Sequence, residues 1–220
     1  MLPQFSDPQL LNTALTHRSI LNEKGLKAAD SNERLEFLGD AVLELATTKF
    51  LYYKFPTENE GSLTAYRSAL VKTTSLSKVA TKLKLGEQIK MSRGEESSGG
   101  RQNPGLLADT MEALIGALYL DQGFEAVENF LKTHLYVHLD QILAEGTYKD
   151  AKSQLQESVQ SQGLPTPTYQ VVEEVGPDHD KLFTVSVSVG EQVVARGQGK
   201  SKQQAQQKAA EVALHQMTNK

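Results

Sequence analysis

The sequence has no cysteine and no long run of apolar residues. Without cysteine there can be no disulfide bond, no thiolate zinc site and no cysteine nucleophile. A membrane-spanning helix needs about 18 consecutive apolar residues, so we expect no contact with a membrane. The opening residues, MLPQFSDPQL, contain neither a basic segment nor an apolar one, and they predict no secretion signal. We therefore expect a cytoplasmic protein.

The chain also lacks an excess of positive charge. Its 220 residues carry a net charge of −4, and residues 149–220 hold eight basic and eight acidic residues. The field of the whole molecule therefore does not attract a polyanion, and contact with a nucleic acid requires a local basic patch. The length suits one large domain or two modest ones.

Acidic residues are concentrated in one segment, residues 32–43, which reads NERLEFLGDAVL. Glu33, Glu36, Asp40 and the following Glu44 lie three or four residues apart, so that a helix places them on one face. Such a face is either solvated or holds a cation. We expect the opposite face to be apolar and buried, and it comprises Leu35, Leu38, Val42, Leu45 and Ala46.

The remaining pattern divides the chain into two domains. Residues 1–143 show helical periodicity, interrupted by a Ser- and Gly-rich stretch at 91–105 that predicts a flexible loop. Residues 144–149 have no core signal and predict a linker. Residues 150–218 contain a helix, three segments of alternating polarity and a final helix. The expected fold is therefore an all-α N-terminal domain followed by a small α+β domain with the order α-β-β-β-α.

A second acidic helix is predicted from Gly105 to about Asp121, and Gly123 separates it from a further helix that ends near Leu143. Asp109 and Glu112 lie three residues apart on one face of this second acidic helix. Small residues, Ala113 and Gly116, continue the same stripe and would let another helix come close.

If the two acidic faces meet, four carboxyl groups converge: Glu36, Asp40, Asp109 and Glu112. Four neighbouring carboxylates cannot all stay charged without compensation. A hard divalent cation with oxygen ligands, such as Mg²⁺, supplies that compensation and can act on a phosphate group. The spacing alone does not establish that the two helices meet.

Both acidic segments are similar to the signatures of a known family. NERLEFLGDAVL together with LLADTMEALIGALYLD resembles ribonuclease III, an endonuclease of double-stranded RNA. The resemblance covers about 210 residues of the chain. It implies an endonuclease domain over residues 1–143 and a double-stranded RNA-binding domain over residues 150–218.

The resemblance also implies roles for individual acids. The Mg²⁺ ligands would be Glu36, Asp40, Asp109 and Glu112, and Mn²⁺ could replace Mg²⁺. Asp40 and Glu112 would be the catalytic residues whose loss damages cleavage most, with Glu33 and Glu60 as accessory acids. The products would carry 5′-phosphate and 3′-hydroxyl ends with short 3′ overhangs, as in the processing of rRNA and mRNA.

An aromatic residue near the acidic edge, Phe37, predicts a partner. The resemblance implies that Phe37 inserts into a pocket of a second subunit and makes a homodimer. Two active centres would then share one valley, and each would cut one strand of the RNA. The alternative is that Phe37 packs under a local loop of its own chain.

In the second domain the resemblance implies three groups of contacts with double-stranded RNA. The first helix would face a minor groove, the turn between the first two strands would reach the next one, and the start of the last helix would hold phosphates. The residues concerned are Ser153, Gln156, Glu157, Gln160, His179, Lys200, Ser201 and Lys202. The family often has more Lys or Arg where this chain has Gln203, Gln206 and Gln207, so we expect weaker binding and a shallower salt dependence.

Other interpretations stay open at this stage. A non-catalytic double-stranded RNA-binding protein of the same fold would have lost one of the four acids, and all four are present. A helical metal-dependent hydrolase of small phosphate esters would use similar acids, although the second domain argues against it. We expect Glu44 to be a solvated acid, His17 to be structural, and His134 and His138 to form a surface or interface pair.

Overall fold

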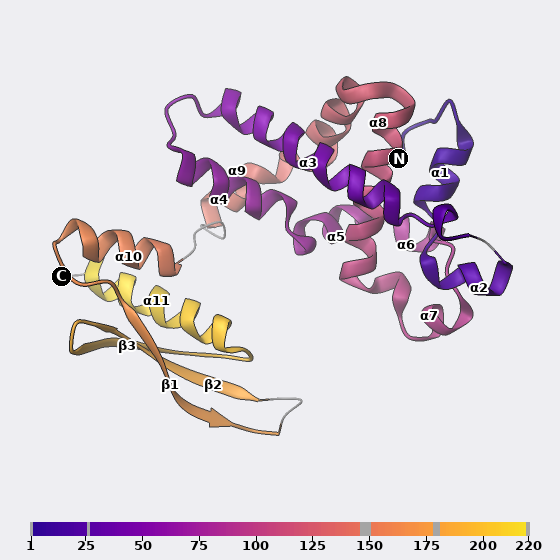
Figure 1. The fold of residues 1–220 in the computed structure, drawn as a ribbon. Helices are drawn as coiled ribbons and strands as arrows, with labels where there is room; N and C mark the ends of the chain where they lie inside the picture. Colours follow the sequence, from indigo (N-terminus) through magenta and orange to yellow (C-terminus); the bar gives the residue numbers. More distant parts are fainter. Residues whose placement is uncertain (1, 26, 146–150, 178–180, 219–220) are drawn as a thin grey trace. The chain divides into compact units, whose positions relative to one another are not determined.

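The structure is a computed structural model of the chain, and it describes residues 2–25, 27–145, 151–177 and 181–218. The chain folds into two compact units, residues 1–148 and residues 149–220 (Figure 1). Within the described residues, no helix is both long and apolar enough to cross a membrane.

The first unit is helical, as its periodicity predicts. Short 3₁₀ turns connect several of its helices: η1 (Arg18–Ile20), η2 (Ala28–Asp30), η3 (Gly100–Gln102) and η4 (Tyr136–His138). Its α-helices are α1 (Pro8–Ala14), α2 (Leu21–Lys24), α3 (Glu33–Lys54), α4 (Glu60–Val71), α5 (Thr73–Lys82), α6 (Leu85–Gln88), α7 (Arg93–Ser97), α8 (Pro104–His134) and α9 (Leu139–Glu145).

The core of this unit surrounds α8. Asn103 caps α8 by accepting a hydrogen bond from the N–H of Gly105 at 2.8 Å, and Pro104 occupies the first helical position. Apolar side chains of α8 pack against those of α3, α5 and α1. The largest fully buried side chains are Leu43, Leu51, Leu70, Leu76, Leu85, Met111, Leu114, Ile115, Leu118, Leu131, Leu135 and Leu139.

Two glycines allow α3 and α8 to cross with their backbones in contact. A side chain on Gly39 would collide with the backbone carbonyl of Glu112, and one on Gly116 would collide with the carbonyl of Leu35. The glycine of NERLEFLGD is therefore required by packing. This contact brings the two acidic segments of the sequence together.

Two details of the first unit differ from the sequence predictions. The predicted flexible loop at 91–105 is wrong, because Ser92 caps α7 by accepting from the N–H of Glu95 at 3.1 Å. Arg101 then ties this stretch to the carbonyl of Gly86 at 2.7 Å. Leu45, predicted to be buried, is 60% exposed because it lies on the outer face of α3.

The predicted break at Gly123 is confirmed, since this residue has a φ of 80° and a ψ of −175°. The helical segment after it ends at His134, whereas the sequence predicted that it would continue to about Leu143. Residues 136–138 form η4 and α9 follows.

The second unit has the predicted order of helix, three strands and helix. Its elements are α10 (Ala151–Ser161), β1 (Thr168–Val175), β2 (Leu182–Val189), β3 (Gln192–Gly199) and α11 (Lys202–Thr218). The strands form one antiparallel sheet in the order β1-β2-β3, and both helices lie against the same face of it (Figure 1). Gly197 lets α11 approach β3, because a side chain there would collide with the backbone of Ala209.

Replacement of Gly39 tests the crossing of α3 and α8. Gly39→Ala forces the two backbones apart, and we expect it to lower the free energy of unfolding by at least about 1–3 kcal/mol, the usual effect of overpacking. The measurement is urea-induced unfolding followed by circular dichroism. Gly94→Ala is the matched control, because the nearest atom to its added carbon lies 3.9 Å away. Equal stability of the two variants would contradict the packing argument.

Candidate active site

The crossing of α3 and α8 places four carboxyl groups on one surface. On α3, Glu36 and Asp40 lie one turn apart, and on α8 Asp109 and Glu112 are spaced in the same way. Gly39, next to Asp40, touches the backbone of Glu112. Asp40 is exposed, whereas the other three acids are half-buried. The two acidic faces therefore meet, which was the condition for the four carboxyl groups to lie near one another.

These acids act on one another electrostatically. The pKa of Glu112 is raised to about 7, mainly by burial. Neighbouring negative charges raise this pKa further, and they come from Asp40, Asp109, Glu36 and Glu44. Burial likewise raises the pKa of Glu36, with further contributions from Asp109, Glu33 and Asp40. The site thus resists full ionisation unless positive charge is supplied.

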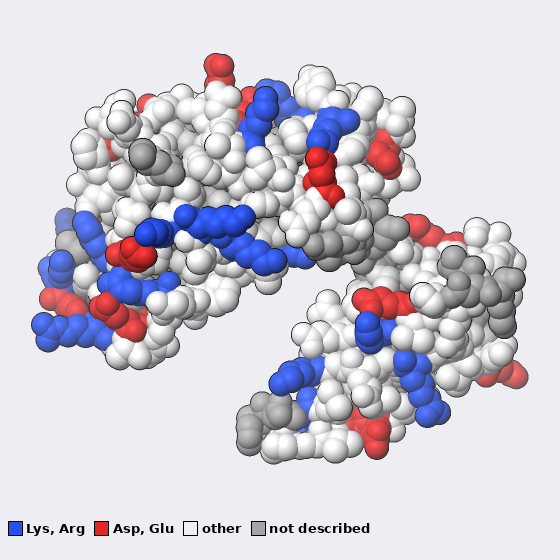
Figure 2. Space-filling view, turned by 180° about the vertical axis from the view of Figure 1, so that it is seen from behind, with Lys and Arg blue, Asp and Glu red and all other residues white. Residues whose placement is uncertain are grey.

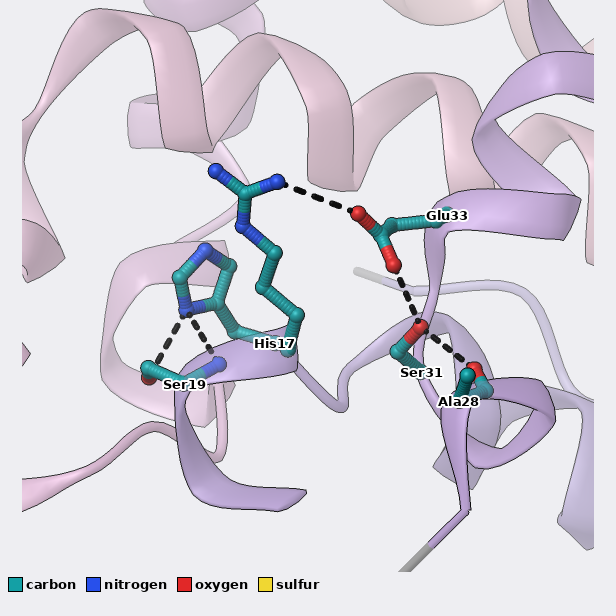
Figure 3. Close-up of polar contacts among 6 residues, drawn as sticks. His17, Ser19, Ala28, Ser31 and Glu33 are labelled. Carbon is teal, nitrogen blue, oxygen red and sulfur yellow. Dashed lines mark hydrogen bonds and ion pairs between the residues drawn. The ribbon is translucent and has the colours of Figure 1, made fainter. Parts of the chain in front are cut away.

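Some positive charge comes from the start of η1. Burial raises the pKa of Asp109, but the nearby charges of His17 and Arg18 act in the opposite direction. His17 itself accepts a hydrogen bond from the N–H of Ser19 at 3.3 Å and lies 2.8 Å from its hydroxyl (Figure 3). These contacts give His17 the structural role expected of it, as the cap of η1.

Glu33 is held at the rim of the site by its own partners. Its carboxylate lies 3.3 Å from the guanidinium of Arg18, and it accepts a hydrogen bond from the hydroxyl of Ser31 at 3.1 Å (Figure 3). Glu60, at the start of α4, is exposed and accepts a hydrogen bond from Thr64 at 3.2 Å. The two predicted accessory acids therefore both have hydrogen-bond partners.

Glu44 is not the solvated acid that the sequence predicted. Its carboxylate lies 2.8 Å from Nε of Arg67, and Nη1 of Arg67 donates to Thr48 at 3.0 Å. Sequence reasoning missed Arg67, because no spacing rule connects a residue of α4 with a residue of α3. Arg67 neutralises the acid next to the central group.

No described residue pairs with the four central acids in a comparable way. None of them forms an ion pair with a residue that the structure describes. The atoms that these acids could offer to a metal are carboxylate oxygens, which suit a hard divalent cation. As the side chains stand, no three His, Asp or Glu residues of the described ranges lie close enough together to hold a metal ion. To hold a metal ion here, these side chains would have to rotate toward one another.

The second unit presents most of its predicted RNA-binding residues to solvent. On α10 the buried residues are Ala151, Leu155 and Val159. The predicted residues of α10 are all exposed: Ser153, Gln156, Glu157 and Gln160. Lys200, Ser201 and Lys202 are exposed at the start of α11, and His179 lies outside the described residues.

Lys202 has an acidic neighbour that the sequence did not indicate. Its ammonium lies 3.2 Å from the carboxylate of Glu174 on β1 and 5.6 Å from the centre of the Phe183 ring. Lys181 lies 3.7 Å from the same carboxylate. A phosphate that binds Lys202 therefore competes with Glu174.

Comparison with known proteins shows to which family the chain belongs. A family model described as ribonuclease-III-like matches residues 7–139, and the double-stranded RNA binding motif matches residues 151–217. The chain belongs to the ribonuclease III family. It is therefore an endoribonuclease by family, with an all-α nuclease domain and an α+β RNA-binding domain.

Individual relatives agree over nearly the whole chain. Ribonuclease 3 of Borreliella burgdorferi is 47% identical over 98% of this chain and 87% of its own length. Ribonuclease 3 of Bacillus licheniformis is 48% identical over 96% of this chain and 84% of its own. Among solved structures, the ribonuclease III nuclease domain from Campylobacter jejuni is 44% identical, with a TM-score of 0.56 over 60% of this chain and 89% of that one.

The raised pKa of Glu112 predicts a pH-dependent stability of the metal-free protein. From its ordinary value of 4.5 the pKa rises to about 7 on folding, so folding takes up a proton between these values and stability falls as pH rises through them. Glu112→Gln removes this effect, and the variant should gain stability relative to the parent at pH 8 but not at pH 4. Thermal unfolding in chelator at both pH values measures this. Glu125→Gln, on the same helix, is the control, and an equal gain at both pH values would contradict the argument.

The contact between Glu174 and Lys202 predicts an effect on RNA affinity. Glu174→Gln frees Lys202 for phosphate, and we expect duplex RNA to bind up to about five-fold more tightly, in keeping with about 1 kcal/mol for an exposed ion pair. Fluorescence anisotropy with a labelled duplex measures the dissociation constant. Glu191→Gln removes the same charge from the turn between β2 and β3. An equal gain in both variants would attribute the effect to net charge alone.

Proposed function

We propose that this member of the ribonuclease III family is a Mg²⁺-dependent endonuclease that cuts double-stranded RNA as a homodimer. The observation that carries the proposal is the backbone contact between α3 and α8, which puts the acids of both helices on one surface. The products would have 5′-phosphate and 3′-hydroxyl ends with short 3′ overhangs, and the substrates would include precursors of rRNA and mRNA.

Glu36, Asp40, Asp109 and Glu112 would hold the metal. A bound Mg²⁺ or Mn²⁺ would polarise a phosphate oxygen and lower the pKa of a water molecule. Burial and like charges raise the pKa of Glu112 and favour its protonated form. A cation that entered the site would lower this pKa again and favour the carboxylate, which is the form that binds a metal. Asp40 is exposed and can meet the RNA backbone directly. Loss of either residue is expected to damage cleavage most.

A stripe of exposed apolar residues on α3 supports the homodimer. Phe37, Leu45 and Tyr52 are 82%, 60% and 65% exposed, and their spacing of eight and seven residues places them on one side of the helix. With this exposure Phe37 does not pack under a loop of its own chain. Apolar side chains in a row on one helix favour burial against a partner. The description of the Campylobacter jejuni structure refers to a region of that protein involved in dimer formation.

The proposed division of labour follows the two units. Residues 1–143 would form the nuclease domain, residues 144–149 the linker, and residues 150–218 the RNA-binding domain. Exposed polar residues of α10 would contact ribose hydroxyls in a minor groove, and the start of α11 would contact phosphates. Ser201 caps α11 by accepting from the N–H of Gln204 at 3.2 Å, which orders this end of the helix.

A comparison of cleavage with binding tests the proposed roles. Glu112→Gln should still bind duplex RNA, because its residue is not on the RNA-binding unit, but should cut it at least a hundred-fold more slowly, which corresponds to about 2.7 kcal/mol of barrier. Gel analysis of a long duplex gives the rate, and anisotropy gives the affinity. Glu125→Gln controls for the loss of one charge from α8. Cleavage that continues in chelator, or that survives in Glu112→Gln, would overturn the proposal.

A further inference from the structure

A basic groove on the nuclease unit is lined by none of the four central acids. It has a volume of about 540 Å³ and runs between α5 on one side and η4 with α9 on the other. The residues that line it are Lys72, Thr74, Ser75, Lys78, Thr81, Lys82, Leu135, His138, Gln141 and Ile142. The set contains three lysines, three hydroxyl groups and no carboxylate.

The lysines of the groove have no acidic partner among the described residues. Lys72, Lys78 and Lys82 are exposed, and none of them forms an ion pair within the ranges that the structure describes. Lys78 and Lys82 lie four residues apart on α5, where like charges are destabilising. Asp140, at the start of α9, pairs instead with Lys54 at 3.4 Å. Seen from behind, Lys and Arg side chains form a band across the nuclease unit (Figure 2).

One lysine of the groove is held by a hydrogen bond to a histidine on the opposite wall. Nζ of Lys82 lies 3.1 Å from Nε2 of His138, and donation by the ammonium requires the neutral ring. Burial and the charges of Lys82 and Lys78 lower the pKa of His138, in agreement with a neutral ring. The contact draws the two walls of the groove together. His134, four residues before His138, packs against the ring of Phe130, with 4.8 Å between the ring centroids.

The floor of the groove is apolar. Leu135 is 1% exposed, and Ile142 is half-buried beside it. A double-helical backbone is a convex surface of phosphate and sugar, which needs neither a concave site nor an apolar floor. A single nucleotide combines a phosphate with a flat ring, and pockets of about 300–1,000 Å³ are the usual size for ligands of this kind.

We propose that this groove binds one nucleotide, with its phosphate held by Lys72, Lys78 and Lys82 and its nucleoside placed over Leu135 and Ile142. The hydroxyl group of Thr74 supplies a further hydrogen bond to the phosphate. The hydroxyl groups of Ser75 and Thr81 donate to the carbonyls of Ala69 and Ser77, so toward the nucleotide they act as acceptors for the sugar hydroxyls. The nucleotide is either free or the unpaired terminal unit of an RNA strand, since the two share this chemistry. The site is independent of the proposed metal centre, because it uses none of the four acids.

Binding to the full chain in the presence of chelator tests the proposal, since chelator prevents metal-bridged binding at the acidic surface. The probes are adenosine and guanosine monophosphate, a short 5′-phosphorylated single-stranded RNA and inorganic phosphate, each followed by calorimetry. Lys78→Gln combined with Lys82→Gln should weaken nucleotide binding at least ten-fold. The control, Lys84→Gln combined with Lys132→Gln, removes two exposed lysines outside the groove and should leave binding unchanged.

A second variant tests the apolar floor. Ile142→Ser should weaken mononucleotide binding several-fold and leave inorganic phosphate unaffected. If the mononucleotides bind and the double lysine variant weakens that binding, the ligand is a free nucleotide. If the double lysine variant weakens binding of the RNA strand alone, the ligand is the terminal unit of a strand. Three results would overturn the proposal: no binding of either probe at millimolar concentration, equal loss in the control variant, or binding of inorganic phosphate as tight as that of the nucleotide.

Discussion

The contact of two helix backbones at Gly39 and Gly116 is the constraint on which the nuclease unit depends. Any side chain at either position would separate α3 from α8 and with them the two pairs of acids. The same contact half-buries Glu112 and places it among its neighbours, which is why its pKa rises. Packing and electrostatics at this site therefore have one cause.

Basic side chains neutralise the edges of the acidic surface and leave its centre charged. Arg18 pairs with Glu33 at one end of the stripe on α3, and Arg67 pairs with Glu44 at the other. The four acids between them have no ion pair with any described residue. This distribution concentrates the uncompensated charge where two helices meet, and a divalent cation is the group best suited to balance it.

Periodicity and spacing predict much of this architecture, but they do not predict which residues of different helices and strands contact each other. The helices, the break at Gly123 and the α-β-β-β-α order follow from local patterns that can be read from the sequence. Whether Asp40 meets Glu112 depends on a tertiary crossing, which the small residues of the second acidic helix and the resemblance to a family suggested but which spacing alone could not establish. The pairs Arg67–Glu44 and Lys202–Glu174 join residues of different elements, so no local rule could find them. The exposure of Leu45 was missed because helical spacing does not say which neighbour covers which face.

The central claim is that acids from α3 and α8 hold one metal centre. Diffraction from crystals soaked in Mn²⁺, with the anomalous signal of manganese, tests it most directly. The account predicts a peak between the two helices, with carboxylate oxygens of Glu36, Asp40, Asp109 and Glu112 among its ligands at about 2.0–2.2 Å. A protein that cuts RNA only with metal, yet shows its manganese bound elsewhere, would contradict the account.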